Sequence, residues 1–167
     1  MRLFVAVLFD DEILSALEGI KTDMRADGIS GTYTARDNLH LTLAFIGDHD
    51  DPRRVIGALE RVSFKPFEIG LKGMGNFGNI LWAGISAGRS LDWLARRVRE
   101  ELEADGIPFD RKKFSPHITL ARKVSDPGWR TDVPEKVMSV RRVSLMLSER
   151  GPQGMIYTEI GGVDCRE

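Results

Sequence analysis

The sequence predicts an α+β fold with antiparallel sheets, and three observations support this class. Strand-like and helix-like segments alternate in the first half of the chain, hairpins dominate the second half, and one five-residue phrase occurs twice. The phrase reads HLTLA at residues 40–44 and HITLA at residues 117–121. Hairpins of this kind favour an α+β protein over a doubly wound parallel sheet. The repeat indicates two related half-domains that meet at one cleft.

The first elements are a strand over residues 2–9 and a helix that Asp10 or Asp11 can cap. This helix ends before Gly28, and its apolar residues recur at helical spacing: Ile13, Leu14, Leu17 and Ile20. An extended segment over residues 31–36 then leads to the first motif.

A strand over residues 38–46 carries the first motif, and the Gly47-Asp48 pair ends it. Residues 52–62 follow as a helix with proline in its first turn. Next comes a hairpin, with strands over 66–74 and 79–86 around the turn GNFGN. This turn lacks the lysine and the following helix of a phosphate-binding loop, so we interpret it as a turn only.

Ser90 is expected to cap an amphipathic helix that ends near Gly106. The second motif lies on a strand over residues 115–123, which a loop rich in proline and glycine follows. Two late strands, over 138–147 and 155–160, are joined by the turn ERGPQG.

Length and composition predict one domain over residues 1–167, with a polar tail from about residue 162. A chain of this size buries roughly 70% of its unfolded surface. Its 42% hydrophobic and 29% charged residues exclude global disorder. No apolar run approaches the roughly 20 residues of a membrane span, and the N-terminus does not have the pattern of a signal peptide. The single Cys165 excludes an internal disulfide, so we expect a cytoplasmic protein. We also expect a monomer, because the sequence has no obvious exposed apolar helix.

The repeated phrase alternates polar and apolar residues, as a half-buried strand does. His40 and Thr42 therefore share one strand face, and His117 and Thr119 share another. If the two strands face each other, two imidazoles and two hydroxyls line one pocket. A neutral histidine can then accept a proton and a protonated one can donate it, which suits cleavage at phosphorus. The threonine hydroxyls can donate to phosphoryl oxygens.

Metal binding is the main chemical alternative, because histidine is a common zinc ligand. Each motif supplies one ligand only, and the chain lacks a cysteine cluster and an H-E-x-x-H motif. The third histidine, His49, lies among Asp48, Asp50 and Asp51, which could hold a hard cation. We favour a solvated turn there, and we expect no metal and no cofactor.

The two motifs, DNLHLTLAFIGD and FSPHITLARK, resemble those of the 2H phosphoesterase superfamily. More narrowly, the chain is similar to its bacterial and archaeal RNA 2′,3′-cyclic phosphodiesterase branch, historically called 2′-5′ RNA ligases. The similarity covers most of the length, including RLFVAVLF at the start and VSLMLSERGPQGMIYTEI near the end. It implies a bilobal fold in which two pseudo-symmetric antiparallel sheets line a central cleft, with helices on the outer faces.

The resemblance also implies a metal-independent hydrolase that opens the terminal 2′,3′-cyclic phosphate of RNA to a 2′-phosphate, with 2′-5′ ligation as a reverse reaction. It makes His40 the general acid and His117 the general base, while Thr42 and Thr119 orient the phosphate. The sequence itself looks symmetric, so the assignment of acid and base rests on the resemblance. Two alternatives remain open. The substrate could be a small cyclic nucleotide phosphate or a 2′-5′ oligonucleotide, or the protein could be an RNA-end binding module with incidental turnover.

Basic residues gather around the second motif, although the net charge of the chain is −1. Residues 111–142 contain nine basic residues and three acidic ones, which fits either a phosphate site or solvated surface. Arg122 holds the position that the family gives to a phosphate-binding cation. In a regular strand Arg122 would point away from His117, and Lys123 would share the face of His117, so both are candidates.

Three aromatic residues are candidates for stacking on a nucleobase: Phe4, Tyr33 and Phe114. Core packing is the favoured interpretation for Phe4. Tyr33 is the preferred platform, because it lies between Thr32 and Thr34 in a segment that polar neighbours make accessible.

Overall fold

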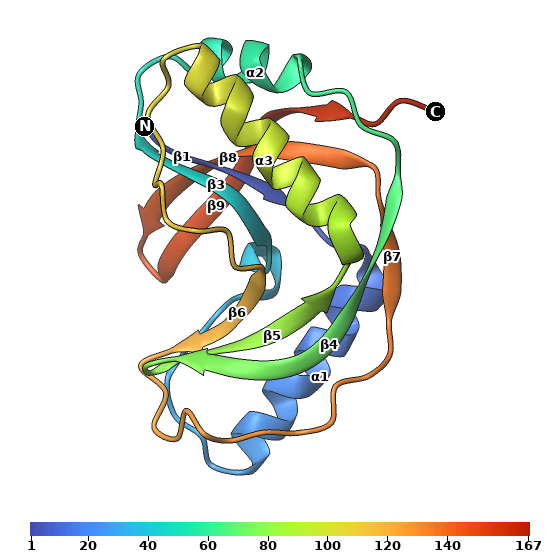
Figure 1. Cartoon of the computed structure of the whole chain (residues 1–167). Coiled ribbons are helices and arrows are strands. Elements are labelled where there is room, and N and C mark those ends of the chain that lie inside the picture. The colour runs from blue at the N-terminus through green and yellow to red at the C-terminus, as the bar shows by residue number, and fades with distance from the viewer.

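Two antiparallel sheets organise the computed structural model, which describes residues 1–167 (Figure 1). The first sheet has the order β3-β1-β8-β9 and occupies the upper half of Figure 1. Its strands are β1 (Arg2–Val7), β3 (Leu41–Asp48), β8 (Arg142–Gly151) and β9 (Gly154–Asp164). The second sheet has the order β2-β6-β5-β4-β7. Its strands are β2 (Thr32–Tyr33), β4 (Phe67–Phe77), β5 (Ile80–Ser86), β6 (His117–Arg122) and β7 (Val137–Val140).

Three α-helices complete the fold and cover the outer faces of the sheets: α1 (Asp11–Ala26), α2 (Pro52–Glu60) and α3 (Gly88–Ala104). A single 3₁₀ turn, η1 (Arg36–Asn38), precedes β3. The helices α2 and α3 pack on the first sheet, and α1 packs on the second. The predicted α+β class with antiparallel sheets is therefore confirmed.

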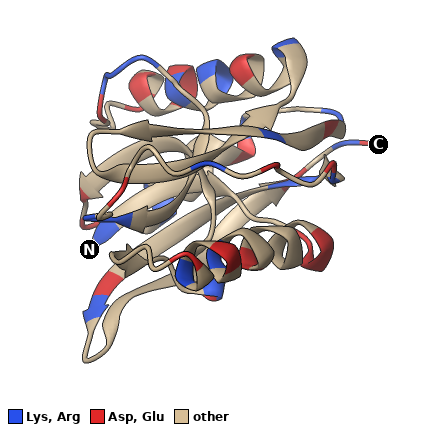
Figure 2. Cartoon of the chain, turned by 90° about the horizontal axis from the view of Figure 1, so that it is seen from below, with Lys and Arg blue, Asp and Glu red and all other residues tan.

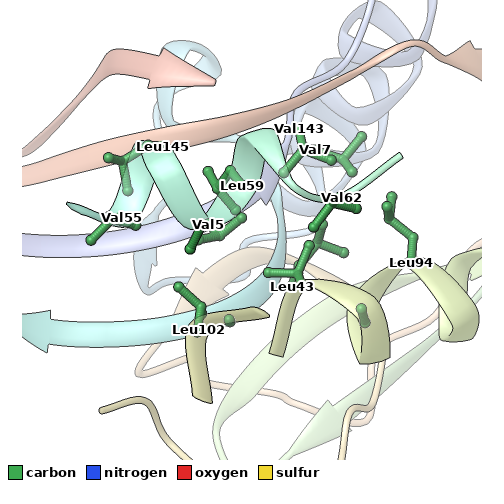
Figure 3. Close-up of a cluster of buried hydrophobic side chains, with 14 of the residues drawn as sticks. Val5, Val7, Leu43, Val55, Leu59, Val62, Leu94, Leu102, Val143 and Leu145 are labelled. Carbon is green, nitrogen blue, oxygen red and sulfur yellow. The ribbon is translucent and has the colours of Figure 1, made fainter. Parts of the chain in front are cut away.

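Each half has its own apolar core between a sheet and its helices. Figure 3 shows part of the larger core, in which side chains of β1, β3 and β8 meet those of α2 and α3. In the second half, Ile13, Leu17 and Ile20 of α1 lie against Ile118 and Leu120 of β6. Figure 2 shows positions of Lys and Arg interspersed with positions of Asp and Glu along the helices, as expected for helices with a solvated outer face.

The predicted cap of the first helix is present, the second helix has a cap that was not predicted, and the predicted cap of the third helix is absent. The Asp10 carboxylate accepts from Ile13 N at 2.9 Å, and Asp51 accepts from Arg54 N at 3.3 Å. Helix α3 begins at Gly88 with no side-chain cap, so the prediction of Ser90 as the cap was wrong. Gly88 has a φ of 59°, a left-handed conformation that lets the chain turn from β5 directly into the helix.

Two strand predictions near the C-terminus need correction. The predicted strand 138–147 is divided between β7 and β8, because the chain passes from the second sheet to the first at Arg141. The predicted polar tail begins later than residue 162, since β9 stays paired with β8 as far as Asp164. None of the helices has both the length and the apolar character that crossing a membrane requires.

Candidate active site

The repeated phrase folds in the same way in both halves, including a β-bulge at its fourth residue, which is leucine in both copies. In the first half, Val5 pairs with Ala44 and Ala6 with Thr42, which leaves Leu43 unpaired. In the second half, Leu81 pairs with Ala121 and Trp82 with Thr119, which leaves Leu120 unpaired. Each bulge shifts the alternation of side chains by one residue.

The bulges decide which residues share a face with the histidines. After each bulge, Ala44 and Ala121 turn into the apolar cores, and the next residue returns to the face of the motif threonine. That residue is Phe45 in the first half and Arg122 in the second. We call the sheet faces that carry Thr42 and Thr119 the inner faces. The two halves therefore differ at one equivalent position, where one has an aromatic ring and the other a cation.

His40 lies just before β3 and is held at both ring nitrogens. Its Nδ1 is 2.7 Å from the carbonyl oxygen of Asn38, and its Nε2 is 2.9 Å from the Thr42 hydroxyl oxygen. A carbonyl only accepts, so Nδ1 carries the proton and the Thr42 hydroxyl donates to Nε2 of the neutral ring.

His117 is the first residue of β6 and has an equivalent bond. Its Nδ1 is 2.8 Å from the carbonyl oxygen of Ser115, again two residues earlier. The same reasoning places the proton on Nδ1 and leaves Nε2 of His117 available for acid–base chemistry. These two carbonyls were not identified from the sequence, although the shared spacing in DNLH and FSPH could have indicated them.

Burial lowers the pKa of His40 below its usual 6.5, and it is the largest cause of the shift. The bond to the Asn38 carbonyl acts in the opposite direction and raises the pKa. The positive charges of His117 and Arg122 lower it further. The charges of His117 and Arg122, on the second sheet, therefore act on His40.

The bulge places Arg122, and not Lys123, with the histidines. Arg122 is exposed at the end of β6, on the inner face. Lys123 follows the strand with a φ of 54° and lies outside the ladder. A regular strand would turn Arg122 away from His117, and the bulge at Leu120 is what turns it to the inner face.

Aromatic rings surround both histidines, and most of them were missed from the sequence. The His40 ring lies 4.8 Å from the ring of Phe4 and 5.4 Å from the ring of Tyr157, centroid to centroid. Phe4 is 2% exposed, so it forms the floor beneath His40, and no surface remains on which a base could stack. Phe45 stacks beside Phe4 at 6.5 Å and is 39% exposed.

The second half has its own aromatic pair beside His117. The Phe77 ring meets the His117 ring edge to face at 5.0 Å and is 43% exposed. Trp82 packs behind Phe77 at 5.2 Å, and it lies 6.1 Å from His117. These residues lie on strands distant in sequence from the motif, and only the folded sheet brings them together.

Two predicted stacking residues do not lie on the inner faces. Tyr33 pairs with Ala121, so it points into the core beneath α1, and its hydroxyl donates to the Ile29 carbonyl at 2.6 Å. Phe114 packs against the core of the first half. It also lies 5.9 Å from the Arg99 guanidinium. The polar neighbours of Tyr33 favoured an exposed ring, but its pairing with Ala121 turns the ring toward α1.

His49, the third histidine, lies in the turn between β3 and α2 and stabilises this turn by a hydrogen bond. His49 Nδ1 accepts from Asp51 N at 3.1 Å, just before α2. No group of three or more His, Cys, Asp or Glu side chains is arranged to hold a metal ion. A hollow of about 670 Å³ lies between β4 and residues 131–137, and none of the predicted site residues lines it.

A two-sheet α+β fold with one His-x-Thr strand from each half defines the 2H phosphoesterase class. The family model described as the 2′-5′ RNA ligase superfamily matches residues 9–152. The chain belongs to this superfamily, so the family predicted from the two motifs is confirmed.

Curated relatives and solved structures agree with this assignment. An RNA 2′,3′-cyclic phosphodiesterase of Archaeoglobus fulgidus is 33% identical, over 96% of this chain and 98% of its own. One of Thermus thermophilus is 34% identical, over 95% of this chain and 87% of its own. The structure of E. coli LigT complexed with 3′-AMP has a TM-score of 0.84 and 25% identity, covering 99% of this chain and 98% of that one. The protein is thus an enzyme of the phosphodiesterase class.

Proposed function

We propose that the protein is an RNA 2′,3′-cyclic phosphodiesterase that hydrolyses a terminal 2′,3′-cyclic phosphate to a 2′-phosphate. One observation carries the proposal. Two histidines from opposite sheets are each fixed at Nδ1 by a carbonyl, which directs Nε2 of each ring to proton transfer. The only hydrogen-bond partner of His40 Nε2 is the Thr42 hydroxyl, which can accept from Nε2 when the ring is protonated. The names of the curated relatives support the same substrate.

In this mechanism His117 Nε2 accepts a proton from water as the water oxygen attacks phosphorus. The bond between phosphorus and O3′ breaks, and protonated His40 gives its Nε2 proton to O3′. The product keeps the phosphate on O2′. Hydroxyl donors such as Thr42 and Thr119 would stabilise the charge that develops on the non-bridging oxygens, and each well-placed donor contributes about 2–4 kcal/mol.

The acid role of His40 requires a proton that the free enzyme holds weakly near neutral pH, because burial lowers the pKa of His40. A phosphate bound beside the ring favours the charged form of the imidazole and raises its pKa. Arg122 would balance part of the phosphate charge from the second inner face. Substrate binding would thereby supply the protonated state that the reaction uses.

Phe45 is the platform that we propose for the terminal base. The leaving O3′ belongs to the terminal nucleoside, so this nucleoside would lie on the side of the acid, His40. Phe45 is the exposed ring on that side. The same arrangement would also allow ligation, in which a 5′-hydroxyl replaces water at His117 and a 2′-5′ phosphodiester forms.

The test is to incubate the protein with an oligoribonucleotide that ends in a 2′,3′-cyclic phosphate, in the presence of EDTA, and to identify the product. We expect a 2′-phosphate end. A 3′-phosphate end would contradict the assignment of O3′ as the leaving group. Binding without turnover would favour the RNA-end binding module, and turnover of cyclic mononucleotides alone would favour the small-substrate alternative.

A further inference from the structure

The carbonyl that orients His40 belongs to a residue with a second set of contacts. Asn38 closes the 3₁₀ turn before β3, and its backbone oxygen accepts from His40 Nδ1. Its side chain donates from Nδ2 to the Met155 carbonyl at 2.7 Å. The Oδ1 atom of the same side chain accepts from Tyr157 N at 3.3 Å. One carboxamide thus bonds to two backbone groups of β9.

Strand β9 offers these groups because it is an edge strand. It pairs with β8 on one side only, so the other side has unpaired N–H and C=O groups. Asn38 satisfies two of them as a strand residue would. The contact joins segments that are more than a hundred residues apart in the chain.

The same part of β9 also contacts the catalytic ring directly. The Tyr157 ring meets the His40 ring edge to face at 5.4 Å and the Phe4 ring at 5.0 Å. The segment that holds Asn38 therefore also limits how far His40 can rotate. Second contacts of this kind fix the tautomer and the direction of an imidazole.

His117 provides an internal comparison. Its Nδ1 acceptor is the Ser115 carbonyl, and the Ser115 side chain makes no hydrogen bond in the structure. The two halves therefore share the carbonyl acceptor, and only the first half anchors it through a side chain. A change at Asn38 should affect one histidine and leave the other unaltered.

We propose that Asn38 is a positioning residue. Its carboxamide is hydrogen-bonded to β9 and thereby holds its backbone carbonyl in place. This carbonyl fixes His40 in its reactive tautomer and orientation. Loss of the hydrogen bonds between Asn38 and β9 lets the Asn38 carbonyl move. The His40 imidazole then exchanges between its two tautomers and between ring orientations. Displacement of a catalytic group by about 1 Å lowers a rate on the order of 10²-fold.

The charges that face His40 support the same reasoning. His117 and Arg122 are the charged groups that lower the pKa of His40, and the Asn38 carbonyl is the hydrogen-bond partner that raises it. The Tyr157 phenol is the other titratable group beside the ring. Weakening the carbonyl bond should therefore lower the pKa of His40 further.

The test compares Asn38→Ala and the isosteric Asn38→Asp with Thr158→Ala, a change at an exposed position of β9. Nitrogen-15 NMR of the imidazoles reports the tautomer and the titration of each histidine, and steady-state kinetics reports kcat and KM. In both Asn38 variants we expect His40 to lose its single tautomer, while the His117 signals stay unchanged. In Asn38→Ala we also expect His40 to titrate at lower pH, whereas the new carboxylate of Asn38→Asp opposes that shift. We expect kcat to fall on the order of 10²-fold with KM nearly constant.

Thr158→Ala should match the wild type in every measurement. The inference is overturned if His40 keeps its tautomer, its titration and the wild-type kcat in a folded Asn38 variant. If Asn38→Ala does not fold, the tautomer and kcat of Asn38→Asp decide the matter. This variant keeps the acceptor for Tyr157 N and replaces the donor to the Met155 carbonyl by a carboxylate oxygen. The kinetic arm rests on the proposed function, but the NMR arm does not, so a protein inactive on cyclic phosphate still tests the positioning.

Discussion

The substitution Gly75→Ala adds one methyl group beside Trp82 and should thereby disturb the position of His117. It lies on β4 opposite Trp82 of β5. The Trp82 indole covers Gly75 so closely that an added Cβ would lie 2.3 Å from Cη2 and Cζ2 and 2.9 Å from Cε2. The backbone of Gly75 is not left-handed, so alanine is acceptable there apart from this overlap.

The size of the effect follows from the overlap. Ordinary carbon contacts begin at about 3.5 Å, so the indole must move by about 1 Å to admit the methyl group. Trp82 pairs with Thr119 and lies 6.1 Å from the ring of His117, so the shift reaches the proposed base. Overpacking costs about 1–3 kcal/mol of the free energy of unfolding, and a shift of this size lowers kcat on the order of 10²-fold.

The assay is urea unfolding together with kcat on the cyclic-phosphate oligonucleotide. The matched control is Gly19→Ala, on the exposed side of α1, where an added Cβ meets nothing within 4 Å. This change should stabilise the protein by about 0.5–1 kcal/mol and leave kcat unchanged. The reasoning is refuted if Gly75→Ala retains wild-type stability and kcat.

Three further predictions concern charge and stacking. NMR of the free protein should show His40 titrating below pH 6.5, and phosphate should move this titration upward. Because the unfolded chain binds this proton at higher pH than the native state, the free energy of unfolding should fall as the pH drops below 6.5 toward the native pKa of His40. Arg122→Gln should weaken phosphate binding about 10- to 100-fold by calorimetry, while Lys123→Gln has little effect. Phe45→Ala should weaken binding of 3′-AMP by about 1–3 kcal/mol and leave phosphate binding unchanged.

Each of these predictions has a contradicting outcome. A His40 titration at or above pH 6.5 in the free protein would show that burial does not control the ring. Equal losses in the Arg122 and Lys123 variants would mean that general surface charge, and not a site, attracts phosphate. A Phe45 variant that loses phosphate and 3′-AMP equally would indicate a distorted inner face.

The central pair of the site could be predicted because it depends on local alternation alone. In a β-strand, side chains two residues apart lie on the same face, so His and Thr of each motif share a face independently of the rest of the fold. The motif repeat then indicates two similar halves, and the structure has the same bulge in each. The family resemblance added the substrate class, which no strand pattern contains.

The sequence could not decide which candidate substrate-binding residues face the histidines, because this depends on the register of pairing. It named Arg122 and Lys123 together without choosing between them. The bulge at Leu120 has no local signature, yet it moves Arg122 to the inner face and Ala121 to the core. Tyr33 pairs with Ala121 and therefore follows it into the core. The aromatic neighbours of the histidines lie on β1, β4, β5 and β9, and only long-range strand pairing brings them to the motifs.

The central claim is that His40 and His117 act as one acid–base unit. Single-turnover rates of His40→Ala, His117→Ala and the double variant on the cyclic-phosphate oligonucleotide test it most directly. Groups that act as a unit are strongly non-additive, so we predict that each single variant loses nearly as much rate as the double variant. Independent losses that multiply in the double variant, or a single variant with nearly wild-type rate, would contradict the account.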